Sequence, residues 1–151
     1  MAARASLWLL LAFAGAAASG CGAPAGPTLE VREPRVVLLP AAGAVYFTVV
    51  NRGDRSDRLL RVETAAARKA ETHESVLEND IMRMVPRPGG FEVPAQGKLE
   101  LKPGGKHVML VEPLPPATAG GSIRLTLRFE RAGAVEIQAP VSAVGEGGET
   151  Q

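Results

Sequence analysis

Apolar and polar residues alternate with a period of two along several short stretches of this 151-residue chain. Residues 123–129 alternate Ile, Leu, Leu and Phe with Arg, Thr and Arg, and residues 135–141 repeat the pattern beyond a turn-like segment at Gly133. Successive side chains of a β-strand point to opposite faces, so this period is typical of a strand with one buried face. The two stretches together predict a β-hairpin.

Turn-forming residues separate further stretches of the same kind. Alternation over residues 45–49 ends at Asn-Arg-Gly-Asp, residues 51–54, and alternation over residues 98–102 ends at Pro-Gly-Gly, residues 103–105. Many short strands divided by Gly and Pro predict an all-β antiparallel sandwich or barrel. Residues 64–80 conflict with this scheme, because their Ala, Arg and Lys residues favour a helix by propensity.

The first twenty residues have the layout of a secretory signal peptide. Arg4 supplies one positive charge, residues 6–18 are mostly apolar, and small residues precede Cys21. The apolar run is short for a membrane-spanning helix, so we predict a cleaved signal peptide over residues 1–20. The tetrapeptide Ala-Ser-Gly-Cys ending at Cys21 is similar to a bacterial lipobox, which predicts lipidation of Cys21 and a lipoprotein of the periplasm or cell envelope. Cleavage without lipidation is the alternative.

The remaining length suits one folded domain. We predict a lipid-anchor cysteine with a short Gly/Pro-rich tether over residues 21–30 and the folded domain over residues 31–142. Residues 143–151 are mostly Gly, small or acidic, and we expect them to form a flexible tail.

Composition excludes several classes of function. Lys and Arg (17) nearly balance Asp and Glu (16) without a basic cluster, and aromatic residues make up only 4%. These values are not those of a nucleic-acid-binding protein. A single cysteine excludes a disulfide within the chain and a multi-thiolate metal site. With no nucleophilic triad or paired carboxylates recognisable, we predict that the protein is not an enzyme.

Potential soft or borderline metal ligands are concentrated in one window of the sequence. His73, Met82, Met84, His107 and Met109 are the only His and Met residues of the chain apart from Met1. On strands, Met82 and Met84 would share one face, and His107 would share one face with Met109. Packing of such strands side by side could bring His73, Met84, His107 and Met109 together.

The ligand types favour monovalent copper. Thioether sulfur is soft and uncharged and suits Cu(I), and imidazole is an acceptable partner. Zinc rarely takes methionine, and calcium or magnesium prefers oxygen. A blue-copper site requires a cysteine thiolate, and Cys21 lies at the predicted cleavage point. The alternative is that these methionines fill a core and the histidines are structural.

Three segments carry a family resemblance: His73-Glu74, Met82-Arg83-Met84, and Leu-Lys-Pro-Gly-Gly-Lys-His-Val-Met-Leu at residues 101–110. They resemble the periplasmic copper chaperones of the PCu(A)C family, whose pattern is His, ten residues, Met, 21 or 22 residues, His-x-Met. Here ten residues separate His73 from Met84 and 22 separate Met84 from His107. The resemblance extends over residues 31–141.

The resemblance implies a cupredoxin-like, Greek-key antiparallel β-sandwich, with a strand rather than a helix over residues 64–80. It implies Cu(I) bound by His73, Met84, His107 and Met109, and delivery of copper to the CuA centre of cytochrome c oxidase. The implied partners are a copper-accepting oxidase subunit and a thiol-containing assembly protein.

Two departures from the family pattern concern auxiliary ligands. Ser75 stands where many members carry a methionine, and the tail lacks the His/Met-rich extension of some members. We take Met82 as an auxiliary ligand or a shield for the site. Two interpretations of Glu74 stay open: a solvated surface residue, or a carboxylate that supports the His73 imidazole. Protons compete for imidazole, so we expect Cu(I) affinity to fall below a pH of about 6.5.

Two other functions stay open. One is copper storage or tolerance, and the other is a metal-free envelope lipoprotein domain that binds other proteins. Binding of Cu(I) separates the second of these from the chaperone hypothesis, and the effect of deletion on oxidase activity separates the first.

Overall fold

The computed structural model describes residues 28–115 and 117–144, which form ten β-strands and no helix. The strands are β1 (Leu29–Leu39), β2 (Ala42–Asn51), β3 (Asp57–Glu63), β4 (Ala67–Glu78), β5 (Ile81–Pro86), β6 (Phe91–Val93), β7 (Gly97–Leu101), β8 (Lys106–Pro113), β9 (Ser122–Phe129) and β10 (Gly133–Ala143).

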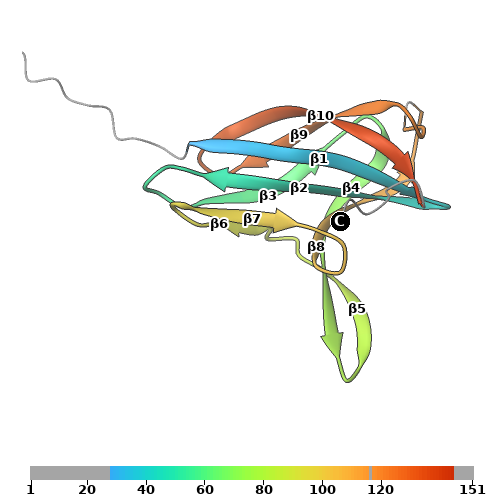
Figure 1. Cartoon of the computed structure of the whole chain (residues 1–151), viewed down its shortest axis with the longest axis horizontal. Coiled ribbons are helices and arrows are strands. Elements are labelled where there is room, and N and C mark those ends of the chain that lie inside the picture. The colour runs from blue at the N-terminus through green and yellow to red at the C-terminus, as the bar shows by residue number, and fades with distance from the viewer. Residues whose placement is uncertain (1–27, 116, 145–151) are drawn as a thin grey trace, which may run out of the picture.

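The strands form two layers that join along one edge (Figure 1). One layer has the order β5-β4-β8-β2-β1, with β7 also paired to β2, and the other has the order β10-β9-β3-β6. The predicted cupredoxin-like sandwich is confirmed. One pair is not antiparallel, since β1 runs parallel to β10 over the partners Val36 and Val141. No short loop connects these first and last strands, so none imposes the antiparallel direction of a hairpin.

The core lies between the layers and consists of the apolar members of each alternating pattern. In β9, Ile123, Leu125, Leu127 and Phe129 are at most 4% exposed, and the residues between them are not buried. The predicted hairpin of residues 123–129 and 135–141 is confirmed as β9 and β10. Other fully buried side chains come from the facing layer and from β3 and β6; they include Val36, Val45, Phe47, Val49, Leu59, Val93, Val108 and Leu110.

The segment with helical propensity is a strand, as the family resemblance implied. β4 pairs with β8 from Ala67 to Glu74 and with β5 from His73 to Glu78. Pairing with β8 and then with β5 supplies backbone hydrogen bonds along the whole strand, and Ala67 and Thr72 are buried. Tertiary pairing therefore outweighs the local preference for a helix.

The predicted turn at residues 103–105 does not reverse the chain. β7 and β8 both run antiparallel to β2, β7 along residues 47–51 and β8 along residues 42–45. They follow one another along the same edge of β2, and residues 102–105 bulge out between them. The bulge is closed by a hydrogen bond from Lys102 N–H to the Lys106 carbonyl, 2.8 Å.

The hairpin of β4 and β5 projects from the sandwich (Figure 1). Its two-residue turn consists of Asn79 (φ 51°) and Asp80 (φ 61°). Positive φ at both central residues is typical of a type I′ turn, which Asn and Asp tolerate better than most residues. We call the part of this hairpin beyond His73, residues 75–84, the arm.

Several expectations concern residues outside the described ones. The predicted signal peptide, Cys21 and all but the first two residues of the predicted tail lie there. β1 begins at Leu29, two residues inside the stretch predicted as a tether. Among the described residues, no helix has the length and apolar character needed to cross a membrane.

Candidate metal centre

Strand register places the two histidines side by side. His73 on β4 pairs with His107 on β8, and their ring centroids are 6.0 Å apart with the planes inclined at 64°. Both residues are buried, at 8% and 6% exposure. One metal ion between the rings can therefore contact a nitrogen of each.

The core fixes the direction of the neighbouring ligand candidates. Val108 and Leu110 are fully buried in the core. Because side chains alternate along a strand, His107 and Met109 lie on the other face of β8. Ala44 on β2 pairs with Met109, and its small side chain leaves room beside the thioether.

A cavity of about 220 Å³ brings residues of five strands together. Three of the four predicted ligands line it: Met84, His107 and Met109. His73 does not line the cavity but packs against His107, which does. The other lining residues are Leu39, Gly43, Ala44, Tyr46, Ser75 and Gly104.

The arm supplies Met84 to this cavity. Met84 pairs with Ser75, so the thioether lies opposite the position where many PCu(A)C members carry a methionine. Met84 is 55% exposed and forms the outer rim of the site. Met82 is also more than half exposed; it pairs with Leu77 farther along the arm and does not line the cavity.

The carboxylate beside His73 belongs to Glu71 and not to Glu74, the candidate from the sequence. Glu74 accepts hydrogen bonds from Arg87 on the opposite face of β4, with a distance of 2.8 Å from Arg87 Nε. Glu71 Oε2 lies 3.3 Å from His73 Nε2. Residues two apart on a strand share a face, and this spacing is the signal that points to Glu71 rather than Glu74.

The bulge contributes backbone groups to the site. The carbonyl of Gly105 accepts a hydrogen bond from Ser75 N–H at 3.0 Å and lies 3.0 Å from Nδ1 of His107. Gly104 has a φ of 74°, a conformation that glycine adopts without strain. The Pro-Gly-Gly sequence therefore connects β8 with the arm. The prediction of an ordinary turn at these residues did not include this connection.

Tyr46 is a member of the site that the sequence analysis did not single out. It lines the cavity, and the Arg35 guanidinium lies 5.3 Å from the centre of its ring. Burial raises the pKa of the Tyr46 hydroxyl, and the positive charge of Arg35 opposes this rise. The Tyr46 hydroxyl is therefore neutral at physiological pH. Its side chain forms part of the cavity wall.

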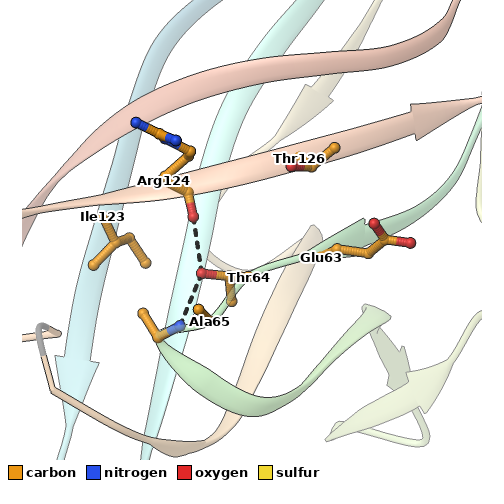
Figure 2. Close-up of a pocket in the computed structure, with 7 residues that line it drawn as sticks. Glu63, Thr64, Ala65, Ile123, Arg124 and Thr126 are labelled. Atoms are coloured by element: carbon orange, nitrogen blue, oxygen red, sulfur yellow. Dashed lines mark hydrogen bonds between the residues drawn. The ribbon is translucent and has the colours of Figure 1, made fainter.

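A second cavity, of about 470 Å³, lies where β3 leads into β4 beside β9 (Figure 2). Two of its polar side chains, those of Thr64 and Glu63, already have partners. The Thr64 hydroxyl donates to the Arg124 carbonyl at 2.8 Å, and the Glu63 carboxylate binds Arg61 and Arg128. These hydrogen bonds, first from Arg61 and then from Arg128, lower the pKa of Glu63. No imidazole or thioether is among the residues that line this cavity: Glu63, Thr64, Ala65, Ala66, Ile123, Arg124 and Thr126.

The donor set at the first cavity is unusual in its lack of carboxylates and thiolates. Among residues 28–115 and 117–144, no three His, Cys, Asp or Glu side chains form a group that could hold a metal ion. The candidate ligands are two imidazoles and two thioethers, with no carboxylate or thiolate among them. Such a set suits a soft monovalent ion better than zinc, calcium or magnesium.

Comparison with known families identifies the family to which the chain belongs. A family model described as "Putative lipoprotein LpqE-like" matches residues 29–141. The chain belongs to this LpqE-like family. Solved relatives of the LpqE-like domain are PCuAC domains, so the resemblance to the PCu(A)C family is confirmed.

Two curated relatives match the LpqE-like domain. A protein of Leifsonia xyli subsp. xyli named as a putative lipoprotein is 34% identical over 98 residues, which cover 65% of this chain and 59% of that protein. An uncharacterized protein of Rickettsia prowazekii is 26% identical over 87 residues, which cover 58% of this chain and 48% of that protein. The matches thus span about half to three fifths of these relatives.

Two solved structures show copper-loaded relatives of the LpqE-like domain. The copper-bound PCuAC domain from PmoF2 has a TM-score of 0.64 and 29% identity, with 79% of this chain and 95% of that domain covered. The Cu(I) form of DR1885 from Deinococcus radiodurans has a TM-score of 0.61 and 28% identity, with coverages of 87% and 89%.

Proposed function

We propose that this chain is an extracytoplasmic Cu(I)-binding chaperone that delivers copper to the CuA centre of cytochrome c oxidase. The observation that carries the proposal is the gathering of imidazole and thioether groups from β4, β5 and β8 on one side of the sheet. The similarity to copper-loaded PCuAC domains supports copper as the cargo.

The exposure of the ligand candidates suits stepwise release. A chaperone must hold Cu(I) and still allow a recipient to replace its ligands one at a time. Met84 is 55% exposed at the rim, whereas His73 and His107 are buried. We infer that an incoming ligand displaces Met84 first and that the two imidazoles leave last. Neutral ligands make this exchange possible without separation of a buried charge pair.

The proposed partners are a copper-accepting oxidase subunit and a thiol-containing assembly protein. A membrane anchor through lipidated Cys21 would keep the domain near a membrane-bound recipient. The description of the family as lipoproteins supports this location in the cell envelope.

Mass spectrometry under native conditions tests the binding step. We expect wild-type protein to retain one Cu(I) ion and a variant with His73→Ala, Met84→Ala, His107→Ala and Met109→Ala to retain none. Met82→Ala is the matched control, because Met82 is as exposed as Met84 but does not line the cavity. Equal Cu(I) binding by wild type and the quadruple variant would refute the site.

Deletion of the gene tests the delivery step. If the protein supplies CuA, the deletion strain loses cytochrome oxidase activity and excess copper in the medium restores it. Normal oxidase activity together with increased copper sensitivity would instead indicate storage or tolerance.

A further inference from the structure

The two imidazoles hydrogen bond through different ring nitrogens. His73 has Nε2 3.3 Å from a carboxylate oxygen of Glu71, and His107 has Nδ1 3.0 Å from the carbonyl oxygen of Gly105. Carbonyl and carboxylate oxygens only accept hydrogen bonds. The nitrogen facing each oxygen must therefore carry the hydrogen, at Nε2 in His73 and at Nδ1 in His107.

A neutral imidazole carries one hydrogen, so the other nitrogen of each ring has a lone pair. In His73 this is Nδ1, which is buried and has no hydrogen-bond partner among the residues that the structure describes. A buried polar atom without a partner destabilises a protein and calls for an explanation. A bound metal ion explains this atom, because the lone pair of Nδ1 can coordinate a metal.

We propose that the metal is held by Nδ1 of His73 and Nε2 of His107, and that Glu71 is the positioning residue for His73. This inference rests on the proposed function, because it concerns the same copper site. The Glu71 carboxylate fixes the hydrogen at Nε2, orients the ring and increases the electron density at Nδ1. The Gly105 carbonyl has the corresponding role for His107 on β8: it fixes the hydrogen at Nδ1 and leaves the lone pair at Nε2.

The strand register explains why Glu71, rather than Glu74, is the carboxylate that can act on His73. Glu71 pairs with Met109, and His73 pairs with His107, so all four lie on one face of neighbouring strands. The Glu71 side chain is 45% exposed, and within residues 28–115 and 117–144 its one salt-bridge contact is with His73. Glu74 is held by Arg87 instead.

The tautomers of the metal-free protein provide a test that needs no copper. Two-bond ¹H–¹⁵N correlation spectra at pH 8 distinguish a protonated ring nitrogen from one with a lone pair. We expect Nε2 to be protonated in His73 and Nδ1 in His107. Protonation at the same nitrogen of both rings would overturn the inference.

Titration with Cu(I) in competition with a chelator tests the role of Glu71. We expect Glu71→Ala to weaken Cu(I) binding about 10- to 100-fold, as is typical when a group that orients a metal ligand is lost. Glu71→Gln keeps an oxygen acceptor and should recover most of the affinity. Glu74→Ala, on the same strand, is the control and should bind as wild type does.

The failures of the two proposals are distinguishable. Absence of Cu(I) binding by wild-type protein refutes the proposed function and the metal contacts inferred here. Normal binding by wild type together with equal binding by Glu71→Ala refutes only the role of Glu71.

Discussion

At the scale of single residues, Val108 and its two neighbours show how burial of one strand face determines where the candidate metal ligands point. Val108 is fully buried, and His107 and Met109 flank it on the opposite face of β8. The hydrophobic effect fixes which face of the strand is inside, at about 25 cal/mol per Å² of apolar surface. The direction of the polar and thioether groups follows from that choice, with no contribution from the metal.

Met109→Ala should weaken Cu(I) binding more than Cu(II) binding, because thioether sulfur prefers the softer ion. Loss of a group that only supports a ligand reduces affinity 10- to 100-fold, so loss of this ligand should reduce Cu(I) affinity by at least about tenfold. Competition titrations with each ion measure the difference, and Met82→Ala is the control. Equal losses for the two ions would argue against selection by thioether.

Glu30 should titrate far below an ordinary glutamate. Hydrogen bonds from Arg32, at 2.8 and 2.9 Å, and from Arg52 lower its pKa to about 2, with Arg32 the larger cause. The folded-state pKa is below the unfolded value of about 4.3, so the stabilisation is present above that pH and disappears as the pH falls through about 2.

Titration of the Glu30 side-chain carbon by NMR measures this shift directly. The midpoint should rise more in Arg32→Ala than in Arg52→Ala. A wild-type midpoint near 4.3 would contradict the interaction.

At the scale of secondary-structure elements, the bulge between β7 and β8 connects two parts of the site. Its Gly105 carbonyl contacts both Ser75 on the arm and His107 on β8. An ordinary hairpin turn would send the chain to another strand and leave no such carbonyl between them. The continuation of the chain along β2 is therefore what places His107 opposite His73.

Gly104→Val should lower the free energy of unfolding by about 1–2 kcal/mol, because a side chain is strained at a φ of 74°. Gly105→Ala is the matched control: its φ is not positive, and an added Cβ would lie 3.6 Å from Lys102 atoms, an ordinary contact. Chemical denaturation should show a change within about 0.5 kcal/mol for the control. Equal destabilisation by the two changes would show that φ is not the cause.

At the scale of the whole molecule, a sandwich with a buried core carries an arm with little core of its own. Core side chains of β2, β8 and β9 are almost fully buried. Four large apolar side chains of the arm are more than half exposed: Leu77, Ile81, Met82 and Met84. A two-stranded hairpin without a packed face is only marginally stable. The candidate site thus joins two imidazoles and one thioether held by the sandwich to a second thioether held by the arm.

Native-state hydrogen exchange should separate these two parts. Amides that pair the arm strands should exchange by local opening, with a free energy below that of global unfolding. Amides of β2 and β9 should exchange only by global unfolding. Measurement by NMR at increasing denaturant tests this, and the same denaturant dependence for arm and sandwich amides would contradict it.

The sequence alone determined the faces of several strands and the chemistry of the candidate ligands. Alternation is a local property, because burial of one strand face requires apolar residues at every second position. It identified β2, β7, β9 and β10. The spacing of His73, Met84, His107 and Met109 and the family resemblance predicted the ligand set, whose binding of copper awaits the titrations above.

The tertiary structure decided which strands lie side by side and therefore which residues meet. Propensity favoured a helix for residues 64–80, and only pairing with β8 and β5 makes β4 a strand. The pairing of His73 with His107 and the inclusion of Tyr46 in the cavity depend on the register between distant segments. Register is fixed by long-range packing of the whole core, so no local pattern in the sequence records it.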